Sequence, residues 1–190
     1  MFSSELQQVL RNAAPLIVGA AAVLGGVGDA MAQGLPGGAT SLHETHGDWT
    51  VNCAVREDGA QCSVSQNQIN GSTQQRVLSI ELVPDVEDNT VVGTLVMPFG
   101  LAVGQDVILS MQEGLSLPPL RFATCLPVGC LVRVAFSSDA IAAMKGGTTL
   151  EAKATASSDG QDVSFSISLA GFSSALERAA AIEISAMTSE

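Results

Sequence analysis

The sequence predicts a mainly β protein: an antiparallel β-sandwich or flattened barrel of about seven to nine strands, with one short helix and a C-terminal helix. Three observations predict this class. Apolar and polar residues alternate over many short segments separated by turn residues. The four cysteines form two close pairs, Cys53 with Cys62 and Cys125 with Cys130. Two segments have the capping and terminating residues that are typical of helices. A β-rich domain with two disulfides accounts for all three.

Residues 1–32 have the pattern of a secretory signal peptide. The stretch 13–28 is almost wholly apolar or glycine, and Ala30-Met31-Ala32 supplies an Ala-x-Ala cleavage site, which predicts Gln33 as the new N-terminus. An uncleaved anchor is the alternative. Its apolar run would be shorter than the roughly 20 residues that span a bilayer, and proline and glycine interrupt it. We therefore expect export and no membrane span after cleavage.

Removing residues 1–32 leaves 158 residues with seventeen acidic and seven basic side chains, a net charge of −10. That length suits a single β-rich domain, which we place at residues 47–190 behind a flexible Gly/Pro-rich leader at 33–46. An acidic chain is repelled by phosphate backbones and by anionic bilayer surfaces. The composition therefore argues against a nucleic-acid partner.

The cysteine spacing favours disulfides over a metal site. An even number of cysteines at short spacings in an exported chain is typical of disulfide bonds. Four thiolates could hold zinc, but the spacings here are C-x8-C and C-x4-C, whereas zinc sites favour C-x2-C. A redox-active pair would be expected at C-x-x-C spacing. We expect disulfides Cys53–Cys62 and Cys125–Cys130, and neither metal nor cofactor.

The first clearly alternating segment begins at Trp49. Period-two alternation puts Trp49, Val51 and Cys53 on one face. Placing Cys53 opposite Cys62 also sets Val51 opposite Val64, so one face stays apolar throughout. This register predicts a cross-strand disulfide and makes Trp49 a core residue; stacking of Trp49 on a sugar is the alternative.

Both histidines, His43 and His46, precede this segment. Their H-x-x-H spacing could place two imidazoles on a metal, but no third ligand of a suitable type lies nearby in the sequence. We expect a solvated surface or a partner contact.

A long polar connection at 66–75 precedes a strand at 76–83 that Pro84 should end. Asp85, Glu87 and Asp88 then form an acidic loop. Its spacing does not match the twelve-residue calcium loop, so a solvated turn is the expectation and a weak calcium site the alternative. A strand at 90–97 follows.

The segment 121–136 predicts a hairpin closed by the second disulfide. Cys125 and Cys130 bracket four residues in which Pro127 and Gly129 occupy the positions preferred in a type I turn. A tight turn is needed to bring the two cysteines within reach of a disulfide bond. If the chain were extended, the five residue steps between them would separate their Cα atoms by roughly 17 Å.

Two helices complete the prediction. The sequence predicts a short helix at 139–145. Serine or aspartate could cap its start, a lysine lies in its last turn and a glycine follows its end. Strands at 148–156 and 162–169 follow, joined by an Asp-Gly turn. Ser174 and Glu177 form a capping box that predicts a terminal helix through Ala181 or a little beyond, with Leu176, Ala180 and Ile184 facing the sheet.

Four motifs in this order resemble one family. They are Gly47-Asp48-Trp49-Thr50-Val51-x-Cys53, Phe122-x-x-Cys125-x-Pro127-x-Gly129-Cys130, the Ala-Met-Lys-Gly helix end, and Ser168-Leu-Ala-Gly-Phe172-x-x-Ala175-Leu176. Across residues 47–180 the chain is similar to the invasion-associated locus B family of exported bacterial proteins. The resemblance implies a mostly β protein of the periplasm or envelope, linked in some pathogens to entry into host cells, and it implies no known catalytic site.

The functional prediction is a non-enzymatic binding or interaction protein. The chain has no tyrosine and no G-x-S-x-G motif, and both histidines precede the domain. We expect a periplasmic protein, with outer-membrane association or secretion as alternatives, that contacts a protein or glycan of the cell envelope or host surface. The candidate contact residues are Trp49, Asp85, Glu87 and Asp88. A hydrolase of envelope material using the acidic loop is one alternative, and a purely structural periplasmic protein is another.

Overall fold

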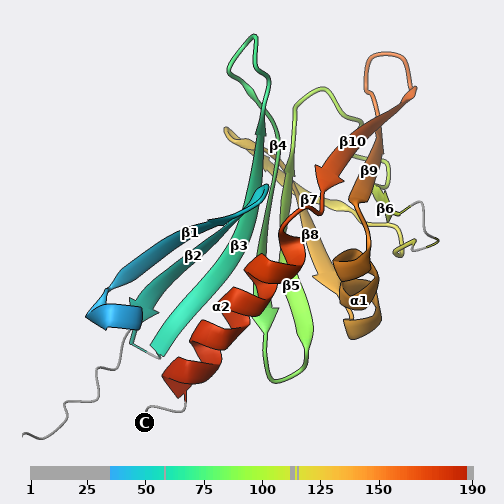
Figure 1. Cartoon of the computed structure of the whole chain (residues 1–190). Coiled ribbons are helices and arrows are strands. Elements are labelled where there is room, and N and C mark those ends of the chain that lie inside the picture. Colours follow the sequence, from blue (N-terminus) through green and yellow to red (C-terminus); the bar gives the residue numbers. More distant parts are fainter. Residues whose placement is uncertain (1–34, 58, 112–113, 115, 188–190) are drawn as a thin grey trace, which may run out of the picture. The chain divides into compact units, whose positions relative to one another are not determined.

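The computed structural model describes residues 35–187 apart from 58, 112–113 and 115, all within the unit Met31–Glu190. The predicted signal peptide, residues 1–32, lies outside the described residues. In the described part the fold is mainly β, as predicted, with ten strands rather than about seven to nine (Figure 1). The strands are β1 (Ser41–His46), β2 (Trp49–Arg56), β3 (Gly59–Ile69), β4 (Arg76–Asp85), β5 (Thr90–Met97), β6 (Ile108–Ser110), β7 (Phe122–Leu126), β8 (Gly129–Phe136), β9 (Thr149–Thr155) and β10 (Asp162–Ser168).

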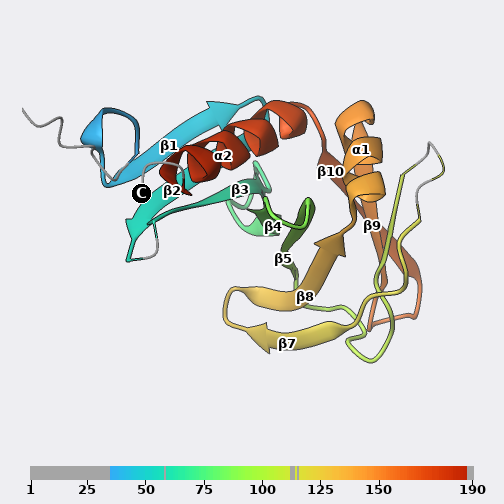
Figure 2. The same ribbon diagram turned by 90° about the horizontal axis from the view of Figure 1, so that it is seen from below.

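Two antiparallel sheets and two α-helices make a sandwich-like arrangement. The larger sheet has the order β1-β2-β3-β4-β5-β8-β7, and the smaller has the order β10-β9-β6. The larger sheet is open, with β1 and β7 at its edges, so the flattened-barrel alternative is not what forms. Helix α2 (Phe172–Met187) lies along strands β1 to β4, and α1 (Ser138–Gly146) lies beside β5 and β8 (Figure 2).

The core follows from strand alternation. In β2 the buried positions are every second residue, Trp49, Val51 and Cys53, and β3 and β4 continue the pattern. The predicted register is confirmed: Cys53 lies opposite Cys62, and Val51 opposite Val64. Both predicted disulfides are present, each with its Cα atoms 4.0 Å apart.

Part of the predicted leader is a strand instead. Residues 41–46 form β1, which pairs antiparallel with β2. The reason is a two-residue turn: His46 lies opposite Trp49, and Gly47, with φ of 57°, takes the first loop position. A glycine with positive φ at this position suits a tight hairpin. The leader prediction for 41–46 was therefore wrong.

The predicted connection at 66–75 was also too long. Strand β3 continues to Ile69, and the turn spans only residues 70–75. The strand is polar here because the side chains of Gln66 and Gln68 hydrogen-bond to the smaller sheet, a role that local pattern does not reveal. Pro84 did not end β4, which runs to Asp85. Proline is tolerated there because the β3–β4 ladder stops at Leu82.

The two helices agree with their predicted bounds to different degrees. Helix α1 agrees with the prediction to within a residue at each end, and Ser137 caps it by accepting from the N–H of Ala140. Helix α2 begins two residues before the predicted cap and ends later, at Met187. Its buried face consists of Phe172, Ala175, Leu176, Ala179 and Ile182, so the predicted face was rotated. Among the described residues, no helix combines the length and apolar content that a membrane crossing requires.

Two turns that are far apart in the sequence interlock. The Asp48 N–H donates to the carbonyl of Ala170 at 3.0 Å. The backbone of Gly171, at a φ of 87°, lies directly against the carbonyl of His46. Next to them, the ring centroids of Trp49 and Phe172 are 5.1 Å apart. This contact fixes the start of α2 against the β1–β2 hairpin.

Candidate functional site

One candidate binding surface is the side of the larger sheet that faces away from α2. Strand alternation turns polar side chains outward there, from β2 to β5. We call this set the open face: Asn52, Ser63, Ser65, Asn67, Ser79, Glu81 and Thr94. These residues, with Arg76, Ile80 and Val96, line a hollow of about 450 Å³.

Hydrogen bonds order one side of the open face. Nδ1 of His43 lies 2.7 Å from Oδ1 of Asn52, and Nδ2 of Asn52 donates to Oγ of Ser65 at 3.1 Å. These bonds connect three neighbouring strands, because His43 lies opposite Asn52 in the β1–β2 ladder. The face therefore offers amide and hydroxyl groups on a rigid sheet, a chemistry that suits hydrogen bonding to a polar partner.

The two histidines do not form a metal site together. In a strand, residues three apart point to opposite faces. His43 faces the open side, whereas Nε2 of His46 lies 3.5 Å from the carboxylate of Glu44, beneath α2. Among the described residues no group of three or more His, Cys, Asp or Glu side chains is placed to hold a metal ion.

The acidic loop is an exposed turn at the end of β4. Oδ1 of Asp85 accepts the N–H of Glu87 at 3.2 Å and the N–H of Asp88 at 3.1 Å. Such bonds are typical of an aspartate that closes its own turn. Asp85 therefore has a local structural role, and the loop does not join the open face.

Trp49 is a core residue. It is fully buried, and its Nε1 donates to the carbonyl of Ser168 at 2.8 Å. Its ring packs against that of Phe172 with an interplanar angle of 59°. The core prediction is thus confirmed, and stacking on a sugar does not fit a side chain with no exposed surface.

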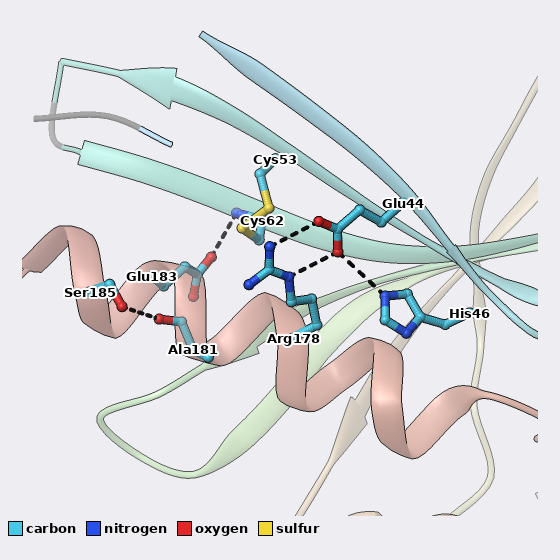
Figure 3. The surroundings of a disulfide bond; sticks show 8 residues. All are labelled: Glu44, His46, Cys53, Cys62, Arg178, Ala181, Glu183 and Ser185. Atoms are coloured by element: carbon cyan, nitrogen blue, oxygen red, sulfur yellow. Dashed lines mark hydrogen bonds and ion pairs between the residues drawn. A yellow bond between two sulfur atoms is a disulfide. The ribbon is translucent and has the colours of Figure 1, made fainter. Parts of the chain in front are cut away.

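Glu183 of α2 satisfies a backbone donor beside the first disulfide. Its carboxylate accepts the N–H of Cys62 at 2.7 Å (Figure 3). The β3–β4 ladder ends at Val64 and Leu82, so Cys62, which lies just beyond it, forms no ladder pair with β4 that could accept its N–H. Burial raises the pKa of Glu183; the Cys62 N–H opposes that shift and the charge of Asp85 adds to it. The carboxylate thus replaces a missing strand partner.

Arg178 ties α2 to the edge strand. Its Nε and Nη2 donate to the two carboxylate oxygens of Glu44 in β1 at 2.8 and 2.9 Å (Figure 3). This paired bond lowers the pKa of Glu44 to about 2; partial burial opposes the shift, and His46 reinforces it. No local pattern predicts this contact, because its two residues are 134 positions apart in the sequence.

A second polar hollow lies where the two sheets meet. Gln66 is buried and uses both ends of its amide: Nε2 donates to the carbonyl of Ser168 at 2.9 Å, and Oε1 accepts the Ser168 N–H at 3.2 Å. The side chain thus takes the place of a strand partner for the edge of β10. The adjoining hollow, about 360 Å³, is lined by Asp48, Gln66, Asn67, Gln68, Thr149, Ser166 and Ser168. Most of its polar groups already bond to each other.

Residues 49–180 match the sequence model of a family described as invasion associated locus B (IalB) protein. The chain belongs to this family. It is 44% identical over 153 residues to an invasion protein B homolog of Brucella abortus (strain 2308), covering 80% of this chain and 87% of that protein. It is 32% identical over 151 residues to invasion protein B of Bartonella bacilliformis, covering 78% and 80%.

The fold agrees with a solved member of the family. The crystal structure of invasion associated protein B from Bartonella henselae superposes with a TM-score of 0.71 at 31% identity, covering 76% of this chain and 99% of that chain. The IalB match begins at Trp49 and ends within α2, so it contains the open face, both disulfides and Arg178. It leaves out β1, which carries Glu44. The names of these relatives refer to invasion and to no enzyme activity.

Proposed function

We propose that this IalB-family chain is a non-enzymatic binding protein of the bacterial cell envelope, and that its open face contacts a protein or glycan. The observation that carries the proposal is the polar hollow on the uncovered side of the sheet. The N-terminal pattern of residues 1–32 and the two disulfides support a periplasmic location, an oxidising compartment in which disulfides persist.

The chemistry of the open face supports binding rather than catalysis. Its serine, asparagine and threonine groups supply donors and acceptors, and Glu81 and Arg76 add one charge of each sign. The small side chains leave the sheet accessible over several strands, which suits an extended or broad partner. The hydrolase alternative would need Asp85 and a second carboxylate to face one cleft, but Asp85 is used by its own turn.

Site-specific photo-crosslinking tests the proposed surface. A photoreactive residue would replace Ser79 on the open face, with Ser158 in the exposed β9–β10 turn as the matched control, and the protein would be irradiated in its native host. We expect a discrete adduct from Ser79 that disappears in a Glu81→Arg background, and none from Ser158. Equal adducts from both positions, or none from Ser79, would overturn the proposal.

Export and the role of the acidic loop are tested separately. Intact mass from the envelope fraction, with alkylation under non-reducing conditions, should give a chain that starts at Gln33 with no labelled thiol. Retention of residues 1–32 would contradict export. Replacing Asp85, Glu87 and Asp88 by alanine should leave the Ser79 adduct unchanged. Loss of a hydrolytic activity in that variant would instead support the enzyme alternative.

A further inference from the structure

Exposed apolar side chains gather at one end of the larger sheet. Among the described residues, five of the nine large apolar side chains that are strongly exposed lie in, or at the edge of, three connections between strands. They are Ile69, Phe99, Val103, Leu126 and Val128. Their exposed fractions run from 47% for Leu126 to 62% for Phe99. We call the segments that carry them, 69–75, 98–105 and 122–129, the apolar end.

Strand pairing brings two of these segments together. Met97, the last residue of β5, lies opposite Cys130 in β8. Phe99 follows that pair by two residues and Val128 precedes it by two. The β7–β8 turn also presses against β5, since the backbone of Gly129 leaves no room for a side chain beside the carbonyl of Met97. Phe99 and the β7–β8 turn therefore share one end of the sheet.

The third segment belongs to the same end. Ile69 pairs with Arg76, the first residue of β4, and β4 runs antiparallel to β5. The start of β4 therefore lies beside the end of β5. Figure 1 shows the β3–β4 connection, the segment after β5 and the β7–β8 turn at the same end of the sheet, opposite the β4–β5 turn.

The apolar end carries no charge in an otherwise acidic chain. The segments 69–75, 98–105 and 122–129 contain no Asp, Glu, Lys or Arg, although the whole chain has a formal net charge of −11. Arg76 lies at its border, next to Ile69. The β9–β10 turn, in which Ser157 donates to the carbonyl of Gly100, adds one carboxylate at the border, Asp159. By contrast, the acidic loop at 85–88 lies at the other end of β4.

We propose that the apolar end docks on an electrically neutral lipid bilayer. Phe99, Leu126 and Val128 insert at the boundary between headgroups and acyl chains, and the Arg76 guanidinium reaches a lipid phosphate. This is a peripheral contact through the end of the sheet, and it shares only Arg76 with the lining of the open-face hollow. Large exposed apolar patches mark either membrane or protein contacts. Here the side chains project from separate turns, an arrangement that a fluid layer accommodates more easily than a rigid protein surface does.

The distribution of charge on the chain predicts a preference for neutral over anionic membranes. The three segments themselves contain no carboxylate that insertion would desolvate, and the adjoining Asp106 is paired with Arg121 at 2.8 Å. The rest of the chain is acidic and is repelled by an anionic surface. Binding should therefore be stronger to neutral lipids than to anionic ones, and added salt should narrow that difference by screening the repulsion.

Vesicle flotation with the disulfide-bonded protein spanning residues 33–190 tests the proposal. The vesicles would contain equal parts of phosphatidylcholine and phosphatidylethanolamine, or the same lipids with added phosphatidylglycerol. The Phe99→Ser/Val128→Ser variant would be compared with Val83→Ser/Val92→Ser, a matched pair of exposed apolar residues on the open side. We expect the first variant to lower partitioning about tenfold or more and the second to leave it unchanged. Urea unfolding would confirm that both variants are folded.

A fluorescence measurement supplies an independent readout. Trp49 is fully buried and should not respond to quenchers in the bilayer, so Phe99→Trp adds a reporter at the apolar end. We expect brominated acyl chains to quench this reporter, and a Val92→Trp control to stay unquenched. Absence of vesicle binding by the wild type, or equal losses in both serine variants, would overturn the proposal. Concentration-dependent dimerisation that Phe99→Ser abolishes, without vesicle binding, would assign the apolar end to self-association instead.

Discussion

The interlocked turns allow a sharp test of how the fold is held together, by the substitution Gly171→Ala. Gly171 has a φ of 87°, and a Cβ built there would overlap the carbonyl oxygen of His46 and crowd the Gly47 backbone. Both obstacles are backbone atoms, so no side chain can rotate away. The matched control is Gly160→Ala, where φ is 72° but nothing lies within 4 Å of the added methyl group.

The expected losses of stability differ because Gly160→Ala carries only the first of the three costs that Gly171→Ala carries. Placing alanine in the left-handed region costs about 1–2 kcal/mol, which is the whole effect expected for Gly160→Ala. Gly171→Ala adds overpacking of about 1–3 kcal/mol and loss of the hydrogen bond from Asp48 to Ala170, about 1 kcal/mol. The total is about 3–6 kcal/mol. For a chain of this size that corresponds to a fall in Tm of roughly 6–24 °C.

Urea and thermal unfolding with both disulfides intact would measure the two variants. Circular dichroism would follow the β signal, and near-ultraviolet signals from Trp49 would report the packing at the interlock. We expect the free energy of unfolding to fall at least about 2 kcal/mol further for Gly171→Ala than for Gly160→Ala. Equal losses would refute the reasoning, because they would mean that the close approach of the two turns contributes nothing beyond backbone strain.

Three further predictions concern α2 and its contacts. The folded pKa of Glu44, about 2, lies below its usual 4.5, so the stability that Glu44 contributes is present above pH 4.5 and is lost as pH falls toward 2. The stability gap between wild type and Glu44→Gln in urea unfolding should therefore close over that window, and a constant gap would contradict this. The pKa of Glu183 is raised, so the sign reverses: Glu183→Gln, which keeps an acceptor oxygen, should be more stable than wild type at pH 7, with the gain vanishing below pH 4.5. A less stable Glu183→Gln at pH 7 would show that the hydrogen bond outweighs desolvation. Trp49→Phe removes the donor to Ser168 and part of the packed ring, and should lower the free energy of unfolding by about 1–3 kcal/mol; a neutral effect would contradict a core role.

Local pattern was sufficient for the two disulfide-closed hairpins and for α1, but it missed β1, which pairs with its chain neighbour β2. The Cys53–Cys62 register followed from apolar alternation plus one covalent constraint, and the Cys125–Cys130 hairpin followed from its turn residues. Helix α1 followed from its caps. Local sequence pattern could not predict the role of a residue whose hydrogen-bond partner is far away in the sequence. Gln66 looks like a loop residue in the sequence, yet it pairs with Ser168 in another sheet.

The candidate site shows the same division. The alternating polar residues of β2 to β5 are visible in the sequence, but they could not be recognised as one surface until α2 was seen to cover the other face. The predicted contacts Trp49 and Asp85 are instead committed to the core and to a turn. A cluster of polar residues within one loop is visible in the local sequence, whereas a polar face shared by four strands is not.

The mainly β class, both disulfides, the acidic charge and the resemblance to the IalB family could all be predicted without a structure, since each depends on composition or on contacts between residues close in the chain. The tertiary structure decided which face of the sheet α2 covers, why Glu183 stands in for a strand partner of Cys62, and how the apolar end is assembled from three segments. These features depend on contacts between residues far apart in the sequence. No local period or turn signal encodes such contacts, because they exist only after the sheets and α2 have packed together.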